Sequence, residues 1–213
     1  MKTLPFLFLL LSLSVTHAGD DLATQLLERI SARRDGGSIT AQFKEKRYLP
    51  MLKEPVSERG TIAFEPPNKF LRKTDDGNLA LSDGTFLWMY YPAFARAEKY
   101  SLARKGGPAV LFSALSAVIQ LHEVERQFFV TATAQPDGYT LVLMPRQSDL
   151  RRMLREATIR LDPELRVVSS SILSTQGDRI ETTYSDEKIL MRAKLDFRFE
   201  CPPSTEIIAP LGE

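Results

Sequence analysis

The sequence is poor in the residue types that most often carry covalent chemistry. Among its 213 residues there is one cysteine, Cys201, and there are two histidines, His17 and His122. A single cysteine excludes an intramolecular disulfide, so the fold must be stabilised by its core. Cys201 stands near the expected end of a strand. We interpret it as a small, partly covered residue, with a reactive thiol or a bridge between two copies as alternatives.

The motifs that mark common catalytic and metal sites are absent from the sequence as well. It contains no Gly-x-Ser-x-Gly, no His-Glu-x-x-His, no pair of Cys-x-x-Cys and no glycine-rich phosphate loop. A solvent-facing or helix-capping role fits His122 better than a weak metal site with the neighbouring glutamates. Asp75, Asp76 and Asp83 lie in expected turns, where aspartate commonly bonds its own backbone. We therefore expect no enzyme activity, no metal and no cofactor.

The first 18 residues have the form of a secretory signal peptide. Lys2 precedes an apolar run over residues 4–15, and small side chains stand at Thr16 and Ala18, the two positions that a signal peptidase reads. The run is shorter than the roughly 20 residues that a membrane-spanning helix needs. Removing this segment with Lys2 leaves equal numbers of basic and acidic residues. A net charge near zero argues against bulk electrostatic binding to nucleic acid.

Hydrophobic periodicity predicts a mainly β protein with a few helices. An amphipathic helix is expected from Asp20 to the residue before Gly36, where glycine favours a helix end. Apolar and polar residues alternate over 39–44 and again over 61–64, which is typical of half-buried strands. Short turns separate further strands, the last of them over residues 193–199. About 11 to 12 strands joined in this way predict an antiparallel meander that curls into a barrel or half barrel.

Residues 79–92 contain the most informative hairpin. Asp83-Gly84 is expected to form a two-residue turn, because this pair accepts the positive φ angles that such a turn needs. In the strand that follows, both alternating sets of side chains are apolar, so both faces must be covered. The two sets are Phe86, Trp88 and Tyr90 on one face, and Leu87, Met89 and Tyr91 on the other.

Residues 108–121 form an uncharged and almost wholly apolar stretch of good helix formers. Gly106-Gly107-Pro108 introduces it, which favours a helix start that can move. A helix that is apolar nearly all round is either buried or faces something hydrophobic. Two interpretations stay open from the residues alone: a plain core helix, and a lid over an apolar cavity.

Motifs along nearly the whole mature chain agree with one known family. They are Gln42-Phe43, residues 60–64, Pro67-Asn68-Lys69-Phe70, the run Ser82-Asp83-Gly84-x-x-Leu87-Trp88-x-Tyr90-x-Pro92, Pro108 with its apolar followers, and Phe197-x-Phe199 before Pro202-Pro203. On these residues the chain resembles the LolA family of periplasmic lipoprotein carriers. The resemblance implies an unclosed antiparallel β half barrel covered by helices, with an apolar cavity between them. It also implies an acylated cargo and no covalent chemistry.

The resemblance further implies which residues contact cargo. Phe70 and Trp88 match positions that line or edge the family's cavity, and Val110 and its neighbours match the lid. Of the two faces of the 86–91 strand, we expect the face with Trp88 to line the cavity. The full expected set is Phe43, Ile62, Phe64, Phe70, Phe86, Trp88, Tyr90, Val110, Leu111, Phe112 and Leu115.

Two positions depart from the family pattern and indicate a divergent branch. The family has an arginine before Pro-Asn that ties the lid shut, and here that position is Pro66. The family also has an aromatic residue two positions after Phe70, and here that position is Arg72. Either another cation closes the lid, with Arg72 and Lys69 the nearest candidates, or the lid stays ajar.

The sequence thus predicts a signal peptide over residues 1–18 and a single carrier domain over 19–213. The carrier is expected to be a periplasmic monomer that takes acyl chains of a lipoprotein or lipid from the inner to the outer membrane. Its expected partners are the cargo, an inner-membrane release complex and an outer-membrane acceptor, but no nucleic acid. The alternatives are a carrier of a glycolipid or other acylated lipid, and a periplasmic lipid-sensing regulatory module.

Export gives the first testable prediction. We expect the mature protein, purified from its own periplasm, to begin at Gly19 because cleavage follows Ala18. We also expect no attached acyl chain, since the cleavage region has no cysteine to carry one. N-terminal sequencing and the intact mass measure both properties. A mature chain that keeps Met1, or that carries an acyl group, would contradict this expectation.

Overall fold

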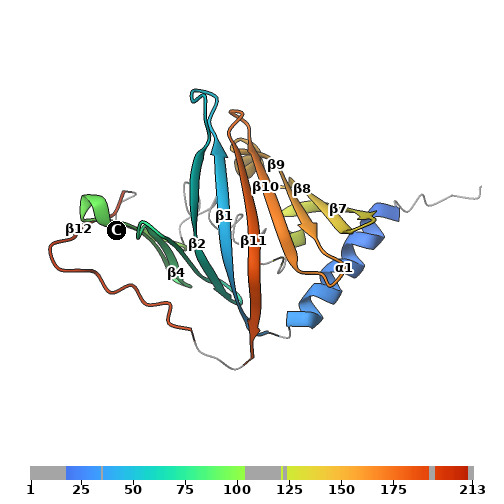
Figure 1. Cartoon of the computed structure of the whole chain (residues 1–213), viewed down its shortest axis with the longest axis horizontal. Helices are drawn as coiled ribbons and strands as arrows, with labels where there is room; N and C mark the ends of the chain where they lie inside the picture. Colours follow the sequence, from blue (N-terminus) through green and yellow to red (C-terminus); the bar gives the residue numbers. More distant parts are fainter. Residues whose placement is uncertain (1–17, 35, 104–120, 122–123, 192–194, 211–213) are drawn as a thin grey trace, which may run out of the picture.

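The computed structural model describes residues 18–34, 36–103, 121, 124–191 and 195–210. Within these ranges the protein is a single large sheet with a helix across one flank (Figure 1). The elements in chain order are α1 (Ala18–Arg34), β1 (Ser38–Tyr48), β2 (Val56–Glu65), β3 (Lys69–Thr74), β4 (Leu79–Asp83), β5 (Phe86–Tyr91), η1 (Pro92–Phe94), β6 (Arg96–Ser101), η2 (Val124–Arg126), β7 (Phe128–Gln135), β8 (Gly138–Pro145), α3 (Ser148–Arg151), β9 (Leu154–Leu161), β10 (Val167–Ser174), β11 (Arg179–Leu190) and β12 (Glu206–Ile208).

The strands of the described residues form one sheet of twelve, in the order β12-β6-β5-β4-β3-β2-β1-β11-β10-β9-β8-β7. Neighbouring strands are antiparallel, except that β12 runs parallel to β6. β1 pairs with β2 on one side and with β11 on the other, so it joins two meanders. The end strands β12 and β7 do not pair with each other in this order, and the sheet stays open. The predicted unclosed antiparallel half barrel is confirmed.

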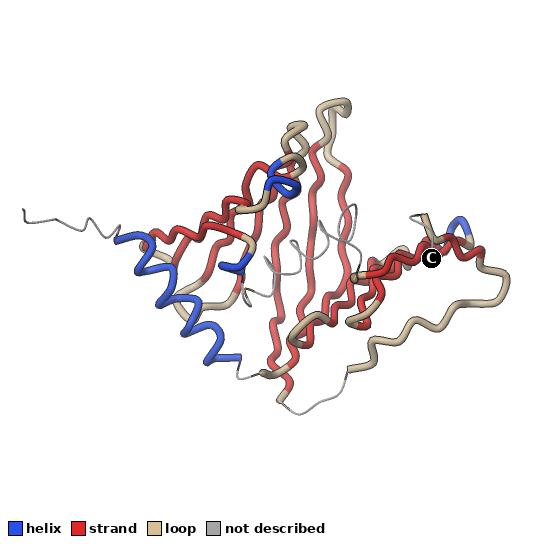
Figure 2. The backbone as a smooth tube through the Cα atoms, turned by 180° about the vertical axis from the view of Figure 1, so that it is seen from behind, coloured by secondary structure: helices blue, strands red, loops and turns tan. Residues whose placement is uncertain are grey.

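The main core lies between α1 and the flank of the sheet formed by β7 to β10. Figure 2 shows α1 crossing this flank. The expected apolar stripe of the helix, including Leu26 and Ile30, is buried against Phe128, Leu141 and Ile159. We call the face of the sheet that α1 covers the inner face, and the opposite face the outer face. In the described part of the chain no helix is both long and apolar enough to cross a membrane.

The β4–β5 turn differs from the predicted two-residue turn. Ser82 pairs with Leu87, so residues 83–86 make the connection. Gly84 has a φ of 97°, but Asp83 does not share the positive φ. Instead, the Asp83 carboxylate accepts hydrogen bonds from the backbone N–H groups of Thr85 and Phe86, both at 2.7 Å. The Asp83 side chain therefore stabilises a turn that is longer than the predicted two residues.

The strand predicted over residues 193–199 is wrong over its described part. Residues 195–200 have no regular secondary structure. They lie against the outer face through side chains: the Phe199 ring centroid is 4.9 Å from that of Trp88 and 5.6 Å from that of Tyr90. The chain then adds β12 to the edge of β6. Cys201, in this segment, is exposed and not partly covered as expected.

Gly138 provides a test of the sheet's packing. It begins β8 with a φ of 139°, and an added Cβ would stand 1.9 Å from the backbone oxygen of Leu161 on β9. We expect Gly138→Ala to lower the free energy of unfolding by about 2 to 4 kcal/mol, because both the backbone strain and the clash must be relieved. Urea denaturation measures the loss.

Gly36→Ala is the matched control for this substitution. Gly36 also has a positive φ, 69°, but nothing lies within 4 Å of an added Cβ. The control should therefore lose only about 1 kcal/mol, from backbone strain alone. Equal losses in the two variants would show that the close approach of β9 to Gly138 does not constrain the sheet.

Candidate functional site

An apolar surface lies on the inner face where β1, β2 and β3 pair. The register places Ile39 opposite Phe64, and Phe64 opposite Phe70. Because strand side chains alternate between faces, every second residue of these strands joins the same surface. We call this surface the apolar floor. Its members, each 8 % exposed or less, are Ile39, Ala41, Phe43, Ile62, Phe64 and Phe70.

Two small cavities adjoin the apolar floor. One, of about 100 Å³, lies between the floor and the end of α1, and its wall includes Ile30, Arg34, Ile39, Phe64, Pro66 and Leu121. The other, of about 20 Å³, lies where the floor meets Val167 and Tyr184. Typical ligand pockets measure about 300 to 1,000 Å³. Neither of these two cavities, as it stands, is large enough for a ligand of ordinary size.

Arg34, the last residue of α1, contributes a charged side chain to both cavities. It is 8 % exposed, and burial lowers the pKa of its guanidinium to about 10, although the nearby Glu187 carboxylate opposes this shift. Arg34 shares one cavity wall with Pro66, the position where the family pattern has arginine. The sequence alone gives no sign that Arg34 borders these cavities, because an arginine near a helix end usually extends into solvent.

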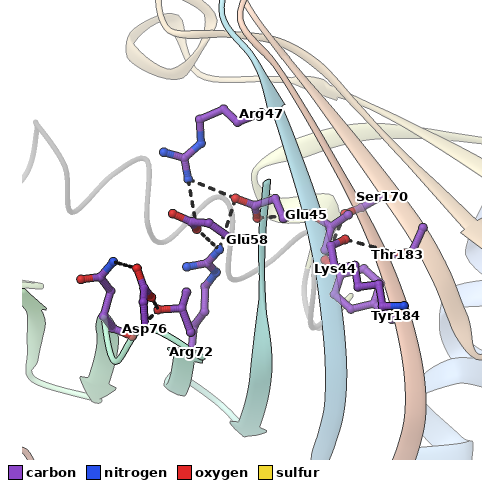
Figure 3. Close-up of polar contacts among 12 residues, drawn as sticks. Lys44, Glu45, Arg47, Glu58, Arg72, Asp76, Ser170, Thr183 and Tyr184 are labelled. Atoms are coloured by element: carbon purple, nitrogen blue, oxygen red, sulfur yellow. Dashed lines mark hydrogen bonds and ion pairs between the residues drawn. The ribbon is translucent and has the colours of Figure 1, made fainter. Parts of the chain in front are cut away.

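A cluster of four charged side chains borders the floor at the end where Phe43 lies (Figure 3). Arg72 Nη2 is 2.8 Å from Glu58 Oε2 and 3.2 Å from Glu45 Oε1. Arg47 Nη2 is 3.0 Å from Glu45 Oε1 and 3.9 Å from Glu58 Oε2. We call these four residues the ion-pair cluster. The Arg72 guanidinium also lies 4.4 Å from the centroid of the Phe43 ring, which is within cation–π range.

The strand register explains how the ion-pair cluster forms. Glu45 stands directly opposite Glu58, and Arg72 stands opposite Ile62 of the floor. Two carboxylates that face each other across a strand pair repel, and the two arginines offset this repulsion. The side chains of Glu45, Arg72 and Glu58 are only 12 to 25 % exposed, so their pairing is sheltered from water. The cluster carries no net charge.

The structure divides the predicted cargo-binding residues between the two faces. Phe43, Ile62, Phe64 and Phe70 all belong to the apolar floor. The described ranges do not include the four predicted lid residues, Val110, Leu111, Phe112 and Leu115.

In the strand register, Phe86, Trp88 and Tyr90 fall on the side of the sheet opposite to the floor residues. They therefore project to the outer face. Phe199 lies over Trp88 and Tyr90, and Lys99 Nζ is 4.0 Å from the centroid of the Phe86 ring. The expectation that this side of the strand lines the cavity is therefore wrong. Leu87, on the other side, is 2 % exposed.

The two cations considered for closing the lid also lie on different faces. Lys69 projects to the outer face, where its Nζ is 2.7 Å from Glu65 Oε1 and 5.8 Å from the centroid of the Phe197 ring. Lys69 is therefore wrongly placed to close a lid over the floor. Arg72 lies on the inner face, and its described partners are the carboxylates of the ion-pair cluster. A lid-closing role for Arg72 stays a prediction.

These features define a class of protein, an open antiparallel half barrel with an apolar floor on its inner face. The family model described as "Outer membrane lipoprotein carrier protein LolA" matches residues 36–197. The chain belongs to the LolA family.

Solved structures are similar to the chain at low sequence identity. An uncharacterised conserved protein from Thermus thermophilus is 11% identical, with 88% of this chain and 99% of that chain covered and a TM-score of 0.53. A LolA superfamily protein from Nitrosomonas europaea is 12% identical (81% and 94% covered, TM-score 0.42). The lipoprotein LppX from Mycobacterium tuberculosis is 14% identical (81% and 99% covered, TM-score 0.41). No curated protein matches the sequence.

The ion-pair cluster provides a test of how the inner face is held together. Arg72→Met leaves Glu45 and Glu58 facing each other with only Arg47 to balance them. We expect this variant to lose about 1 to 3 kcal/mol of unfolding free energy, because a partly buried carboxylate loses its partner. Adding Glu58→Gln to Arg72→Met should restore most of the loss. Urea denaturation of the single and double variants measures both effects.

Arg59→Met is the control, because Arg59 pairs with Asp75 at 2.6 Å on the exposed outer side of β2. An exposed ion pair contributes about 0 to 1 kcal/mol, so this variant should stay close to the parent. If Glu58→Gln fails to rescue Arg72→Met, then Arg72 stabilises the sheet by packing on Phe43 and not by balancing charge.

Proposed function

We propose that this LolA family protein is a periplasmic carrier that binds acyl chains on the apolar floor. It moves its cargo, a lipoprotein or a lipid, from the inner to the outer membrane without covalent chemistry. The observation that carries the proposal is the floor itself: six contiguous apolar side chains on one face of an open sheet. Family membership agrees with this reading.

Acyl chains match the floor in chemistry. Each methylene group that leaves water contributes about 0.8 kcal/mol, so eight of them contribute roughly 6 kcal/mol. Part of this free energy is offset by the loss of freedom on binding and by the separation of groups that now cover the floor. Cargo is thus held firmly but without a covalent bond, and a partner that offers a better apolar surface can remove it.

The proposal also covers the export of the protein, its partners and its cargo. The protein is exported as a monomer, and an inner-membrane release complex and an outer-membrane acceptor are its partners. Val110, Leu111, Phe112 and Leu115, which lie outside the described residues, are proposed to contact the cargo as well. A carrier of an acylated lipid with a polar head group is the second candidate, and the ion-pair cluster beside the floor favours it.

Binding on the inner face is tested by placing a polar group on each face in turn. We expect Ile62→Gln to weaken binding of a fluorescent fatty-acid probe at least tenfold, because an amide without a partner in an apolar site costs about 1 to 3 kcal/mol. Native mass spectrometry of protein purified from its own periplasm should show a bound acylated molecule in the parent and much less in this variant.

Tyr90→Gln is the matched control, since Tyr90 lies on the outer face under Phe199. Its affinity for the probe should equal that of the parent, and circular dichroism should show the same β content in all three proteins. If Tyr90→Gln releases the probe and Ile62→Gln does not, cargo binds to the outer face. If the parent binds no acyl probe, the carrier function is wrong.

A further inference from the structure

We infer that the ion-pair cluster of Glu45, Arg47, Glu58 and Arg72 binds an uncharged polar head group of the cargo. The cargo then lies with its acyl chain on the apolar floor and with hydroxyl or amide groups at the cluster. This inference rests on the proposed function, and it names the substrate class that the site selects.

The floor and the cluster follow each other along a single strand. The inward-facing residues of β1 are Ile39, Ala41 and Phe43, followed by Glu45 and Arg47. Residues on one face of a strand are spaced by about 6.6 Å, so the change from apolar to charged occurs within one repeat. Phe43 belongs to the floor and also lies under the Arg72 guanidinium. An amphipathic molecule aligned with β1 meets both surfaces without a gap.

The cluster offers donors and acceptors side by side. Its two guanidinium groups can only donate hydrogen bonds and its two carboxylates can only accept them. The Nε–H of Arg47 is buried and has no hydrogen-bond partner among the described residues. Hydroxyl and amide groups both donate and accept, so they can bond to both kinds of partner at once. Hydrogen bonds to charged groups are also stronger than those between neutral groups.

The charge balance of the cluster disfavours a charged head group. A phosphate that binds Arg72 must displace the Glu45 and Glu58 carboxylates, which lie 3.2 and 2.8 Å from Arg72 Nη2. Those carboxylates would then face an added negative charge without a partner. A cationic head group would displace the arginines in the same way. Selectivity of this kind comes from the cost imposed on the wrong ligand.

Neutral hydroxyl groups extend the polar surface from β1 towards β10. Thr182 Oγ1 donates to Glu45 Oε2 at 3.3 Å. The hydroxyls of Tyr184 and Ser170 are 3.0 Å apart (Figure 3). Tyr184 stands opposite Phe43, so it lies beside the junction of floor and cluster. Burial raises the pKa of Tyr184, which keeps its hydroxyl protonated and uncharged. This strip suits a head group with several hydroxyls.

Ligands with one dodecyl chain and different head groups test the inference. They are dodecyl maltoside for a sugar, N-dodecanoyl-glycinamide for the amides next to an acylated peptide end, dodecyl phosphate as an anion, and dodecyltrimethylammonium as a cation. Each compound competes with a fluorescent fatty-acid probe for binding to the mature protein. It is used below its own micelle-forming concentration. We expect at least one uncharged compound to have a Kd about tenfold below both charged compounds. The tighter of the two uncharged compounds distinguishes a glycolipid from a lipoprotein.

Variants then test whether the ion-pair cluster causes the preference for an uncharged head group. Arg72→Met should weaken binding of the preferred uncharged compound about tenfold, whereas Arg59→Met, the outer-face control, should bind it as the parent does. Glu58→Gln is the second variant: it gives the cluster a net positive charge, so affinity for dodecyl phosphate should rise while the uncharged preference falls. The Glu58→Gln readout compares ligands within one protein, so a general loss of folded material does not imitate it.

The failures of the two proposals are distinguishable. If all four compounds displace the probe with equal Kd and Arg72→Met changes none of them, the inference is wrong and acyl binding stands. If dodecyl phosphate binds most tightly, the cluster is an anion site and the inference is overturned. If neither the fatty-acid probe nor any dodecyl compound binds, the carrier function itself fails, and the inference with it.

Discussion

The double pairing of β1, with β2 on one side and β11 on the other, is the interaction on which the rest of the structure depends. It joins the β2–β6 meander to the β7–β11 meander, so the sheet becomes long enough to curve around an inner face. It also fixes the register that places Phe43 opposite Tyr184 and Glu45 opposite Glu58. A slip of one residue would turn the floor of β1 to the outside and its lysines inward.

The same register lets an open sheet carry apolar side chains on both faces of one strand. β5 contributes Leu87 to the inner face and Trp88 to the outer face. Phe199, from a segment more than a hundred residues later in the chain, packs on the outer side chains Trp88 and Tyr90. That segment continues into β12, which pairs with β6 and covers a sheet edge that would otherwise be exposed. One C-terminal stretch thus covers both an apolar face and an unpaired edge.

Charged groups inside an apolar site are the property that distinguishes this chain from a simple lipid-binding surface. Arg34 stands at one end of the floor, beside Ile39 and Phe64, and the ion-pair cluster stands at the other end, beside Phe43. Burying such groups is costly unless they are paired, and the cluster satisfies this condition by carrying two charges of each sign. The floor is therefore bounded at both ends by groups that can interact with the polar part of a ligand.

The sequence by itself determined most of the secondary structure, because alternation, turn residues and helix caps are local properties. It placed the helix α1 and most strands, and it identified Phe43, Ile62, Phe64 and Phe70 as members of one surface. It placed strand ends less well, as in β2, whose polar end does not alternate. Only the tertiary structure decided which face of β5 is the inner one, since both faces are apolar and the cover comes from Phe199. It also decided the partners of Arg34 and Arg72, because an arginine's surroundings depend on which distant strands or helices pack beside it.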